Sequence, residues 1–239
     1  MTFEKPKMLD TASEGARAFF DYFEYLIKNR QERRESMEKR VILVIPGFLF
    51  SDPMTTIFRN KLSEIGHYTY GWRNGTNIGV REKDIQVQMD LIKELYEKHN
   101  KKVTLIGYSL GGVYAKELAF LCKDMVDEVI TMGSPINDYS GSCSSITTLY
   151  QFLNKPLDHD ALEELEKAFF SNVRNFDDIK ITSIYSKSDG IVQWQASHIE
   201  NESENSRNIE VGGAHLGLLV NVNAMKAVIS VLEKEKTNI

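Results

Sequence analysis

From residue 40 to the C-terminus, short apolar runs alternate with longer segments of helical periodicity. The near-continuous apolar run in RVILVIPG is typical of a strand that is covered on both faces of a sheet. Apolar residues at helical spacing, such as Ile85, Met89 and Ile92, instead predict an amphipathic helix. Strands are predicted at 40–47, 67–72, 101–108, 127–135, 179–187 and 207–213. Helices are predicted at 51–66, with Asp52 as N-cap, and at 83–100, 110–123 and 214–236.

Strands and helices that alternate in this way predict an α/β fold, with a mostly parallel sheet of about six strands and helices on both faces. In such sheets, ligands bind at the carboxyl ends of the strands. The alternation is interrupted at about 136–178 by a Ser-rich stretch and one further helical pattern. We interpret this insertion as a small cap or lid over the site, and a crossover helix with a long loop is the alternative. The chain then divides into an N-terminal segment, 1–40, and an α/β domain, 41–239.

The N-terminal segment contains one amphipathic helix, followed by a charge run of mixed sign at 28–40. One stripe of the helix is formed by Phe19, Phe20, Phe23, Leu26 and Ile27. We expect this stripe to pack on the body of the domain or on a second subunit, because any docked helix needs an apolar stripe. The alternative is peripheral membrane contact, because an amphipathic helix that ends in basic residues could lie on an anionic membrane surface.

Composition and charge exclude several classes of protein. The 239 residues can bury a substantial core, and the net charge of −5 argues against a nucleic-acid partner. The chain has two cysteines, Cys122 and Cys143, which are too few for the disulfide framework of a small secreted protein. The N-terminus lacks the apolar region of a secretory signal, and no apolar run of about 18 residues predicts a membrane span. The cytoplasm is therefore the expected location.

The stretch VTLIGYSLGGVYAKELA places one serine between a predicted strand and a predicted helix. Gly107, Ser109 and Gly111 fit the pattern G-x-S-x-G, in which a sharp turn exposes the serine hydroxyl to a base. The pattern alone is weak, and its position between a strand and a helix is what favours a nucleophile over an idle serine.

A serine becomes nucleophilic when a base takes its proton, and the base needs a third group to orient it. In this architecture the order along the chain is serine, acid, histidine. His215 follows the last predicted strand, whereas His198 lies in a polar loop, so His215 is the predicted base. Asp189 directly follows the preceding strand and is the predicted acid. Its alternative role is that of a simple Asp-Gly turn.

An acyl-transfer site also needs N–H donors for the developing oxyanion. The N–H of Leu110, the residue after the predicted nucleophile, is one candidate. The second is expected from the loop after the first strand, IPGFLFSD, with Phe48 as the first choice and Leu49 as the second.

Taken together, these pieces resemble the α/β-hydrolase superfamily, and within it small lipase-like and esterase-like proteins. The resemblance runs from about residue 41 to the C-terminus and rests on VIPGF, GYSLGG, SDGIV and GGAHLGL. It implies a catalytic triad of Ser109, Asp189 and His215, with no cofactor and no metal. Lipases of this kind usually carry His-Gly where this chain has Pro46-Gly47. The resemblance therefore does not specify the outer wall of the oxyanion site or the substrate.

The sequence therefore predicts a serine hydrolase that cleaves carboxylic esters. Its expected partner is a small acyl ester or a lipid, in a pocket formed by Leu49, Tyr108, Leu149, Phe152, Phe169 and Phe170. An acyltransferase, a thioesterase or an amidase would use the same triad. A lipid-binding or scaffold protein without catalysis is a further alternative. The oligomeric state is not predicted.

Overall fold

The computed structural model describes residues 6–28, 38–136 and 179–233. Within these ranges, six strands form one sheet in the order β2-β1-β3-β4-β5-β6, and every neighbouring pair is parallel. The strands are β1 (Val41–Ile45), β2 (Tyr68–Gly71), β3 (Val103–Tyr108), β4 (Val126–Met132), β5 (Lys180–Tyr185) and β6 (Ser206–Glu210). This arrangement confirms the predicted α/β fold.

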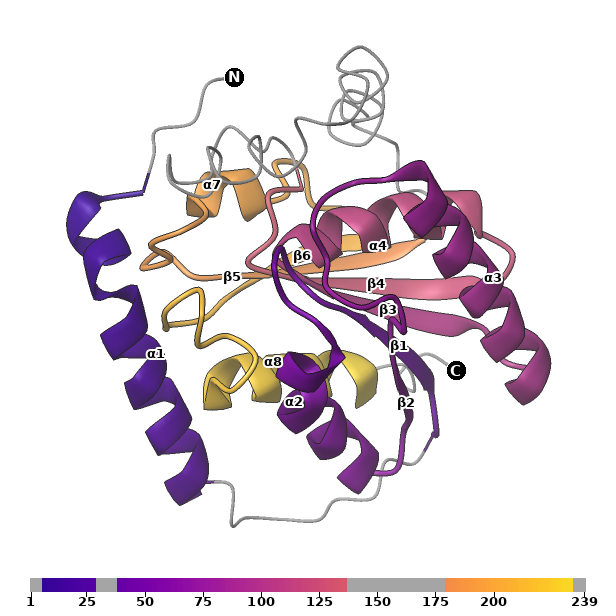
Figure 1. The fold of residues 1–239 in the computed structure, drawn as a ribbon, viewed down its shortest axis with the longest axis horizontal. Helices are drawn as coiled ribbons and strands as arrows, with labels where there is room; N and C mark the ends of the chain where they lie inside the picture. The colour runs from indigo at the N-terminus through magenta and orange to yellow at the C-terminus, as the bar shows by residue number, and fades with distance from the viewer. Residues whose placement is uncertain (1–5, 29–37, 137–178, 234–239) are drawn as a thin grey trace.

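Helices cover both faces of the sheet, as Figure 1 shows. The covering helices are α2 (Asp52–Glu64), α3 (Glu82–His99), α4 (Leu110–Leu121) and α8 (Val222–Glu233). Val41, Leu43 and Ile45 of β1 enter one core with α3 and α4. Ile42 and Val44 enter the other core with α2 and α8. Since successive residues of a strand point to opposite faces, burial on both sides explains the uninterrupted apolar sequence of β1.

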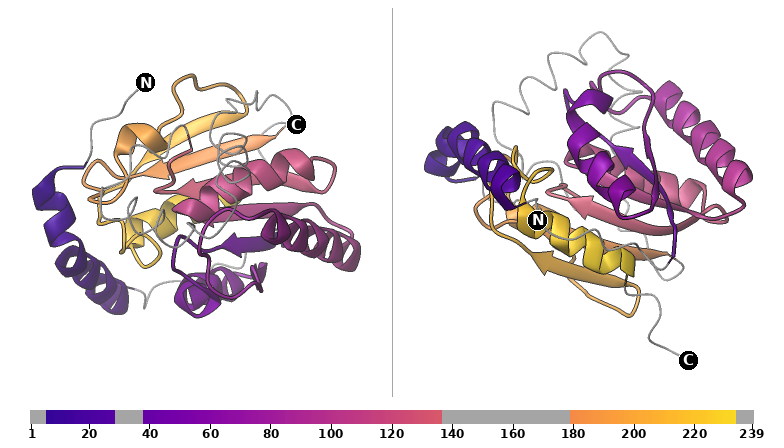
Figure 2. Two further views of the ribbon diagram at one scale, coloured as in Figure 1. Left: turned by 45° about the horizontal axis from the view of Figure 1, so that its top comes forward. Right: turned by 90° about the horizontal axis from the view of Figure 1, so that it is seen from below.

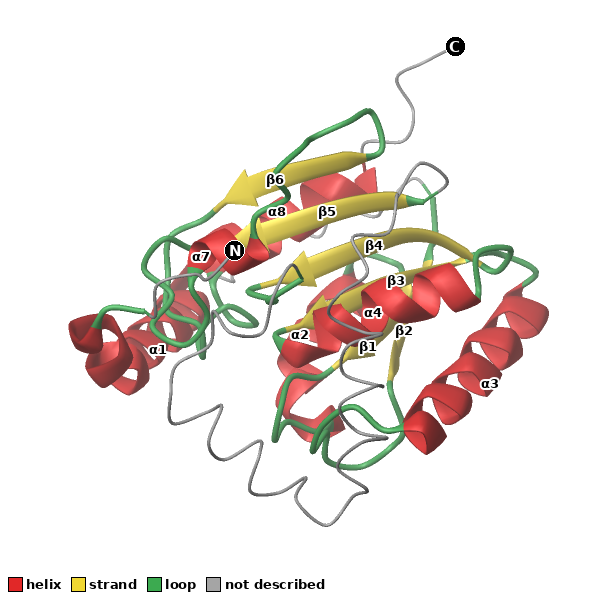
Figure 3. Ribbon diagram, turned by 90° about the horizontal axis from the view of Figure 1, so that it is seen from above, coloured by secondary structure: helices red, strands yellow, loops and turns green. Residues whose placement is uncertain are grey.

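The carboxyl ends of the strands lie at one edge of the sheet, because all six strands run in the same direction. Figure 3 shows α1 (Met8–Lys28) and the short α7 (Trp194–Ser197) beyond this edge. The loops after β3, β5 and β6 therefore meet there, and they carry Ser109, Asp189 and His215 respectively.

Helix α1 lies at the margin of the molecule and contacts α8 (Figure 2). Its apolar stripe does not pack on the domain: Phe19 is 64% exposed and Phe20 is 69% exposed, and Phe23 and Leu26 are exposed as well. Helix α1 does pack on the domain, as expected, but through another side than this stripe. Contact of the stripe with a second subunit or with a membrane stays a prediction. None of the described helices is long and apolar enough to cross a membrane.

Two helix starts differ from the sequence prediction. The N-cap of α2 is Ser51, and the carboxylate of Asp52 instead accepts the N–H groups of Trp72, at 2.9 Å, and Arg73, at 3.0 Å. This contact joins the start of α2 to the end of β2. The last helix begins at Val222 rather than near 214, because residues 215–220 form turns. Apart from Ile136, the predicted cap at 136–178 lies outside the described residues.

Candidate active site

Ser109 occupies a strained turn between β3 and α4. Its φ of 53° and ψ of −125° are unusual for a residue with a side chain, and such strain is common at functional sites. A Cβ on Gly107 would overlap the main chain of Gly111 and Gly112, so the strand and the helix meet this closely only because Gly107 has no side chain. The turn has the strand–turn–helix geometry that the G-x-S-x-G pattern requires.

The loop after β1 passes directly against Ser109. A Cβ on Gly47 would lie 2.9 Å from the Cβ of Ser109, which is closer than side chains normally approach. Phe48, the first choice for an oxyanion donor, follows Gly47 in this loop. Leu110 begins α4, and the first N–H groups of a helix have no acceptor within the helix. The two predicted oxyanion donors thus belong to segments that flank Ser109.

Asn77 holds this loop in place. The N–H of Leu49 donates to the main-chain oxygen of Asn77 at 2.6 Å, and the N–H of Asn77 donates to the oxygen of Phe50 at 2.9 Å. The side chain of Asn77 also donates to the oxygen of Pro46 at 2.8 Å. Since the Leu49 N–H is engaged in this way, the second choice for an oxyanion donor is wrong.

Ser109, His215 and Asp189 form a chain of hydrogen bonds. Nε2 of His215 lies 3.0 Å from Oγ of Ser109, and Nδ1 of His215 lies 2.6 Å from Oδ2 of Asp189. The other carboxylate oxygen of Asp189 accepts the N–H groups of Ile191, at 2.9 Å, and Val192, at 2.7 Å. One carboxylate oxygen is therefore fixed by its own loop, and the other faces the imidazole.

The environment of His215 favours its protonated form. Burial by itself would lower the pKa of this imidazole, but the charge and hydrogen bond of Asp189 and the charge of Glu14 raise it, and the net direction is upward. The carboxylates therefore stabilise the positive charge that the imidazole gains when it accepts a proton.

Tyr108 has a different place from the one expected. Its side chain is 1% exposed and its hydroxyl donates to the main-chain oxygen of His215 at 3.0 Å. Tyr108 therefore supports the histidine loop, residues 211–221 between β6 and α8, rather than lining a substrate surface. Leu49 is exposed, and its contact with substrate stays a prediction. The other predicted pocket residues lie outside the described residues: Leu149, Phe152, Phe169 and Phe170.

The alternative base, His198, belongs to a group of aromatic rings. Its ring lies 5.3 Å from the ring of Tyr185 and 5.7 Å from that of Trp194, between centroids. In the described part of the chain, no three His, Cys, Asp or Glu residues are grouped so that they could hold a metal ion.

Sequence reasoning missed Glu14 and Asp21 of α1, whose carboxylates accept main-chain N–H groups of the histidine loop. Both residues stand in the predicted helix as ordinary polar positions, and no local signal marks them. Asn77 was also missed, although its segment, RNGTNIGV, stands out as a Gly-rich loop between two predicted elements.

Comparison with known proteins places this geometry in a family. A family model described as "PGAP1-like alpha/beta domain" matches residues 79–228, a range that includes Ser109, Asp189 and His215. The chain belongs to this family. The PGAP1-like domain is of the α/β-hydrolase superfamily, as the resemblance of the sequence implied. A search of curated proteins finds no match.

Solved structures of lipases share the fold of this PGAP1-like chain. The mature lipase BlEst2 of Bacillus licheniformis is 17% identical, with a TM-score of 0.60 over 83% of this chain and 94% of the lipase. A soluble variant of the monoglyceride lipase of Saccharomyces cerevisiae is 12% identical, with a TM-score of 0.62 over 84% of this chain and 88% of that one. The monoacylglycerol lipase of Paleococcus ferrophilus is 14% identical, with a TM-score of 0.52 over 82% and 96%.

Proposed function

We propose that this protein is a serine hydrolase that cleaves carboxylic esters through an acyl-enzyme on Ser109. The observation that carries the proposal is the continuous hydrogen-bonded chain from Ser109 through His215 to Asp189. Three side chains from three different strand ends meet in the order that a nucleophile, a base and an orienting acid need. The likeness of the fold to solved lipase structures supports the same reaction class.

In the first half of the proposed reaction, Oγ of Ser109 forms a bond to the acyl carbon of the ester while its proton passes to Nε2 of His215. The N–H groups of Phe48 and Leu110 stabilise the negative charge on the former carbonyl oxygen. The carbon–oxygen bond to the alcohol then breaks, and the alcohol leaves with the proton that His215 returns. Asp189 keeps Nδ1 of His215 protonated, so that Nε2 faces Ser109.

In the second half, water attacks the acyl carbon of the Ser109 ester. His215 accepts the proton of the water and then returns it to Oγ of Ser109 as the acyl group leaves as a carboxylic acid. The raised pKa of His215 favours the imidazolium that forms in both halves. The oxyanion donors are used twice, and each typically contributes about 3–4 kcal/mol to lowering the barrier.

We propose an acyl lipid, such as a monoacylglycerol, as the substrate class. Two of the structural relatives are a monoglyceride lipase and a monoacylglycerol lipase, and both share the fold with this chain at 12% and 14% identity. Leu49 provides an exposed apolar side chain in the loop after β1, next to Phe48, and the aromatic residues of the insertion would add to an acyl pocket.

Hydrolysis of a series of p-nitrophenyl esters, from acetyl to long acyl chains, tests the proposal. We expect activity in the wild type, a preference for acyl chains longer than acetyl, and a loss of about 10⁴- to 10⁶-fold in turnover in Ser109→Ala. Turnover that is equal in the wild type and Ser109→Ala would exclude Ser109 as the nucleophile.

Acyl transfer, thioester cleavage and amide cleavage would proceed through the same acyl-enzyme. Adding an alcohol to the assay separates transfer from hydrolysis, because a transferase forms the new ester faster than it releases the acid. A lipid-binding or scaffold protein would bind acyl lipids equally well in the wild type and in Ser109→Ala and would turn over neither ester nor thioester.

A further inference from the structure

Helix α1 carries two buried carboxylates, although it lies outside the helices that cover the sheet. Glu14 is 4% exposed and Asp21 is 9% exposed, and they lie two helical turns apart on the side of α1 that faces the domain. Carboxylates are seldom buried in proteins unless hydrogen-bond donors or cations surround them. Their partners therefore show what this side of the helix contacts.

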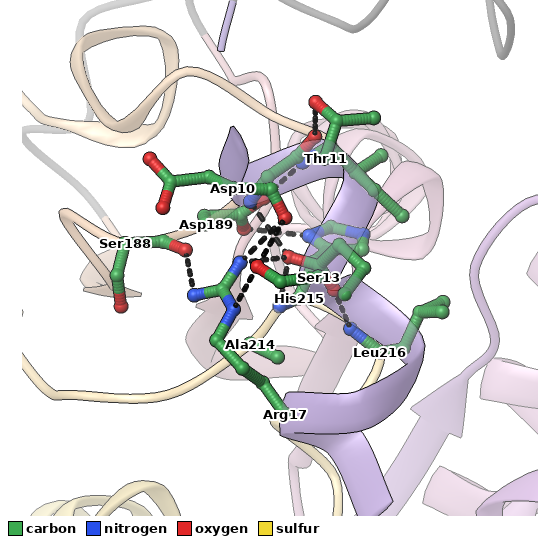
Figure 4. Close-up of polar contacts among 12 residues, drawn as sticks. Asp10, Thr11, Ser13, Arg17, Ser188, Asp189, Ala214, His215 and Leu216 are labelled. Atoms are coloured by element: carbon green, nitrogen blue, oxygen red, sulfur yellow. Dashed lines mark hydrogen bonds and ion pairs between the residues drawn. The ribbon is translucent and has the colours of Figure 1, made fainter. Parts of the chain in front are cut away.

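Glu14 contacts the loops that carry two of the three triad residues. Figure 4 shows these loops, with Asp189, His215 and Leu216 labelled, beside the start of α1. Its Oε1 accepts the N–H of Gly190 at 2.7 Å and the N–H of His215 at 3.0 Å. Its Oε2 accepts the N–H of Leu216 at 3.0 Å. Gly190 directly follows Asp189 in the acid loop, residues 186–193 between β5 and α7. This one carboxylate therefore joins the acid loop to the histidine loop.

We propose that Glu14 is a positioning residue of the active site, and that α1 completes the site by holding the acid loop and the histidine loop at a fixed separation. The inference rests on the proposed hydrolase function and adds to it a part of the chain outside the residues that match the family, which begin at 79. Glu14 would act through the main chain of His215 rather than on the substrate.

Further contacts tie the start of α1 to the acid loop. The hydroxyl of Thr11 donates to the main-chain oxygen of Gly190 at 2.5 Å, and the guanidinium of Arg17 donates to the oxygen of Ser188. Arg17 also forms an ion pair with Glu14 at 3.1 Å, which orients the carboxylate. A Cβ on Gly190 would overlap the main chain of Asp10, so the helix and the loop are in direct contact.

Asp21 ties the middle of α1 to the histidine loop. Its Oδ2 accepts the N–H of Ala214 at 3.2 Å, and its Oδ1 accepts a side-chain N–H of Asn221 at 2.8 Å. The side-chain oxygen of Asn221 in turn accepts the N–H groups of Asn223 and Ala224 at the start of α8, both at 3.0 Å. The histidine loop is thereby held by α1 at its beginning and at its end.

Glu14 also contributes charge to the site. His215 is faced by Asp189 from the loop after β5, by Tyr108 and Ser109 from the end of β3, and by Glu14 from α1. The charge of Glu14 adds to that of Asp189 in raising the pKa of His215 against the effect of burial. Loss of this charge should therefore lower the pKa of His215.

The test is Glu14→Gln in the full chain, which keeps the shape of the side chain, removes its charge and turns an amide N–H toward main-chain N–H groups. We expect kcat to fall about 10- to 100-fold with little change in KM, because small displacements of catalytic groups have effects of this size. The acid limb of the kcat/KM profile should move to lower pH. Amide hydrogen exchange should become faster at residues 188–192 and 213–218.

Two further variants make the result specific. Glu82→Gln removes the same charge at an exposed position on α3 and should keep the wild-type kcat, the wild-type acid limb of the kcat/KM profile and the wild-type exchange of both loops. Glu14→Asp keeps the charge but shortens its reach, so it should lower kcat and speed exchange while the acid limb stays close to that of the wild type. If Glu14→Gln fails to fold, kcat and hydrogen exchange in Glu14→Asp test the proposal instead.

Hydrogen exchange, and the pKa of His215 read by NMR, need no turnover. They test the positioning role of Glu14 even if the wild type hydrolyses no ester. The hydrolase proposal and the positioning proposal can therefore fail separately. A folded Glu14→Gln protein with wild-type exchange in both loops and an unchanged pKa of His215 would overturn the inference, as would equal effects in Glu82→Gln.

Discussion

Nε2 of His215 lies 3.0 Å from Oγ of Ser109, although 106 residues separate them in the chain. The two side chains meet because β3 and β6 are parallel strands of one sheet, so the loops that follow them emerge at the same edge. The distance suits a hydrogen bond in which the neutral imidazole accepts the serine proton.

The close approach of Gly47 to Ser109 predicts that Gly47→Ala impairs turnover. The new Cβ would lie 2.9 Å from the Cβ of Ser109 and 3.0 Å from the ring of Tyr108, so Ser109 or the loop after β1 must move. We expect kcat for an activated ester to fall about 10- to 100-fold. Gly212→Ala is the matched control, because nothing lies within 4 Å of its added Cβ. Wild-type kcat in Gly47→Ala would show that the loop does not need this approach.

The raised pKa of His215 predicts the pH dependence of the reaction. Below this pKa the imidazole is protonated and cannot accept the serine proton, so kcat/KM should fall as the pH drops through a value above 6.5. In Asp189→Asn, less negative charge opposes the effect of burial on the pKa of His215. This pKa should therefore fall, and the acid limb of the kcat/KM profile should move to lower pH. The same variant should lose about 10⁴-fold in kcat, because it no longer fixes the tautomer of His215. An acid limb that is identical in both proteins would mean that another group controls the profile.

The order in which residues follow the strands was enough to predict the fold and the hydrogen-bonded chain. Ser109, Asp189 and His215 each lie in the segment that follows a strand, and a parallel sheet brings such segments together whatever the distance along the sequence. The role of α1 could not be predicted in this way. Its periodicity drew attention to Phe19 and Phe20, whereas its contacts with the domain are made by Glu14 and Asp21, whose partners lie about two hundred residues away.

Local signals also failed where a distant contact competed with them. Asp52 stands where an N-cap is expected, but its carboxylate is taken by the main chain at the end of β2. Tyr108 neighbours the nucleophile and so suggested contact with substrate, yet its hydroxyl is taken by the main chain of His215. In each case a backbone group from another segment outweighed the local preference.

The exposed stripe of α1 leads to a prediction about lipid surfaces. Phe19, Phe20, Phe23 and Leu26 are exposed, and apolar side chains on one side of a helix can insert at a membrane surface. We expect the wild type to sediment with vesicles that contain anionic lipid, and a Phe20→Glu, Phe23→Glu double variant to stay in the supernatant. Phe120→Glu on α4 changes an exposed phenylalanine elsewhere and should bind like the wild type. A wild type that ignores the vesicles would leave this stripe without a membrane role.

Covalent labelling by a fluorophosphonate, followed by mapping of the modified peptide, tests the central claim most directly. The reagent reacts with a serine whose hydroxyl is activated by a neighbouring base. The account predicts one adduct per chain, located on Ser109, absent from Ser109→Ala and formed much more slowly in His215→Ala. An adduct on a different residue, or labelling of Ser109→Ala at the wild-type rate, would contradict it.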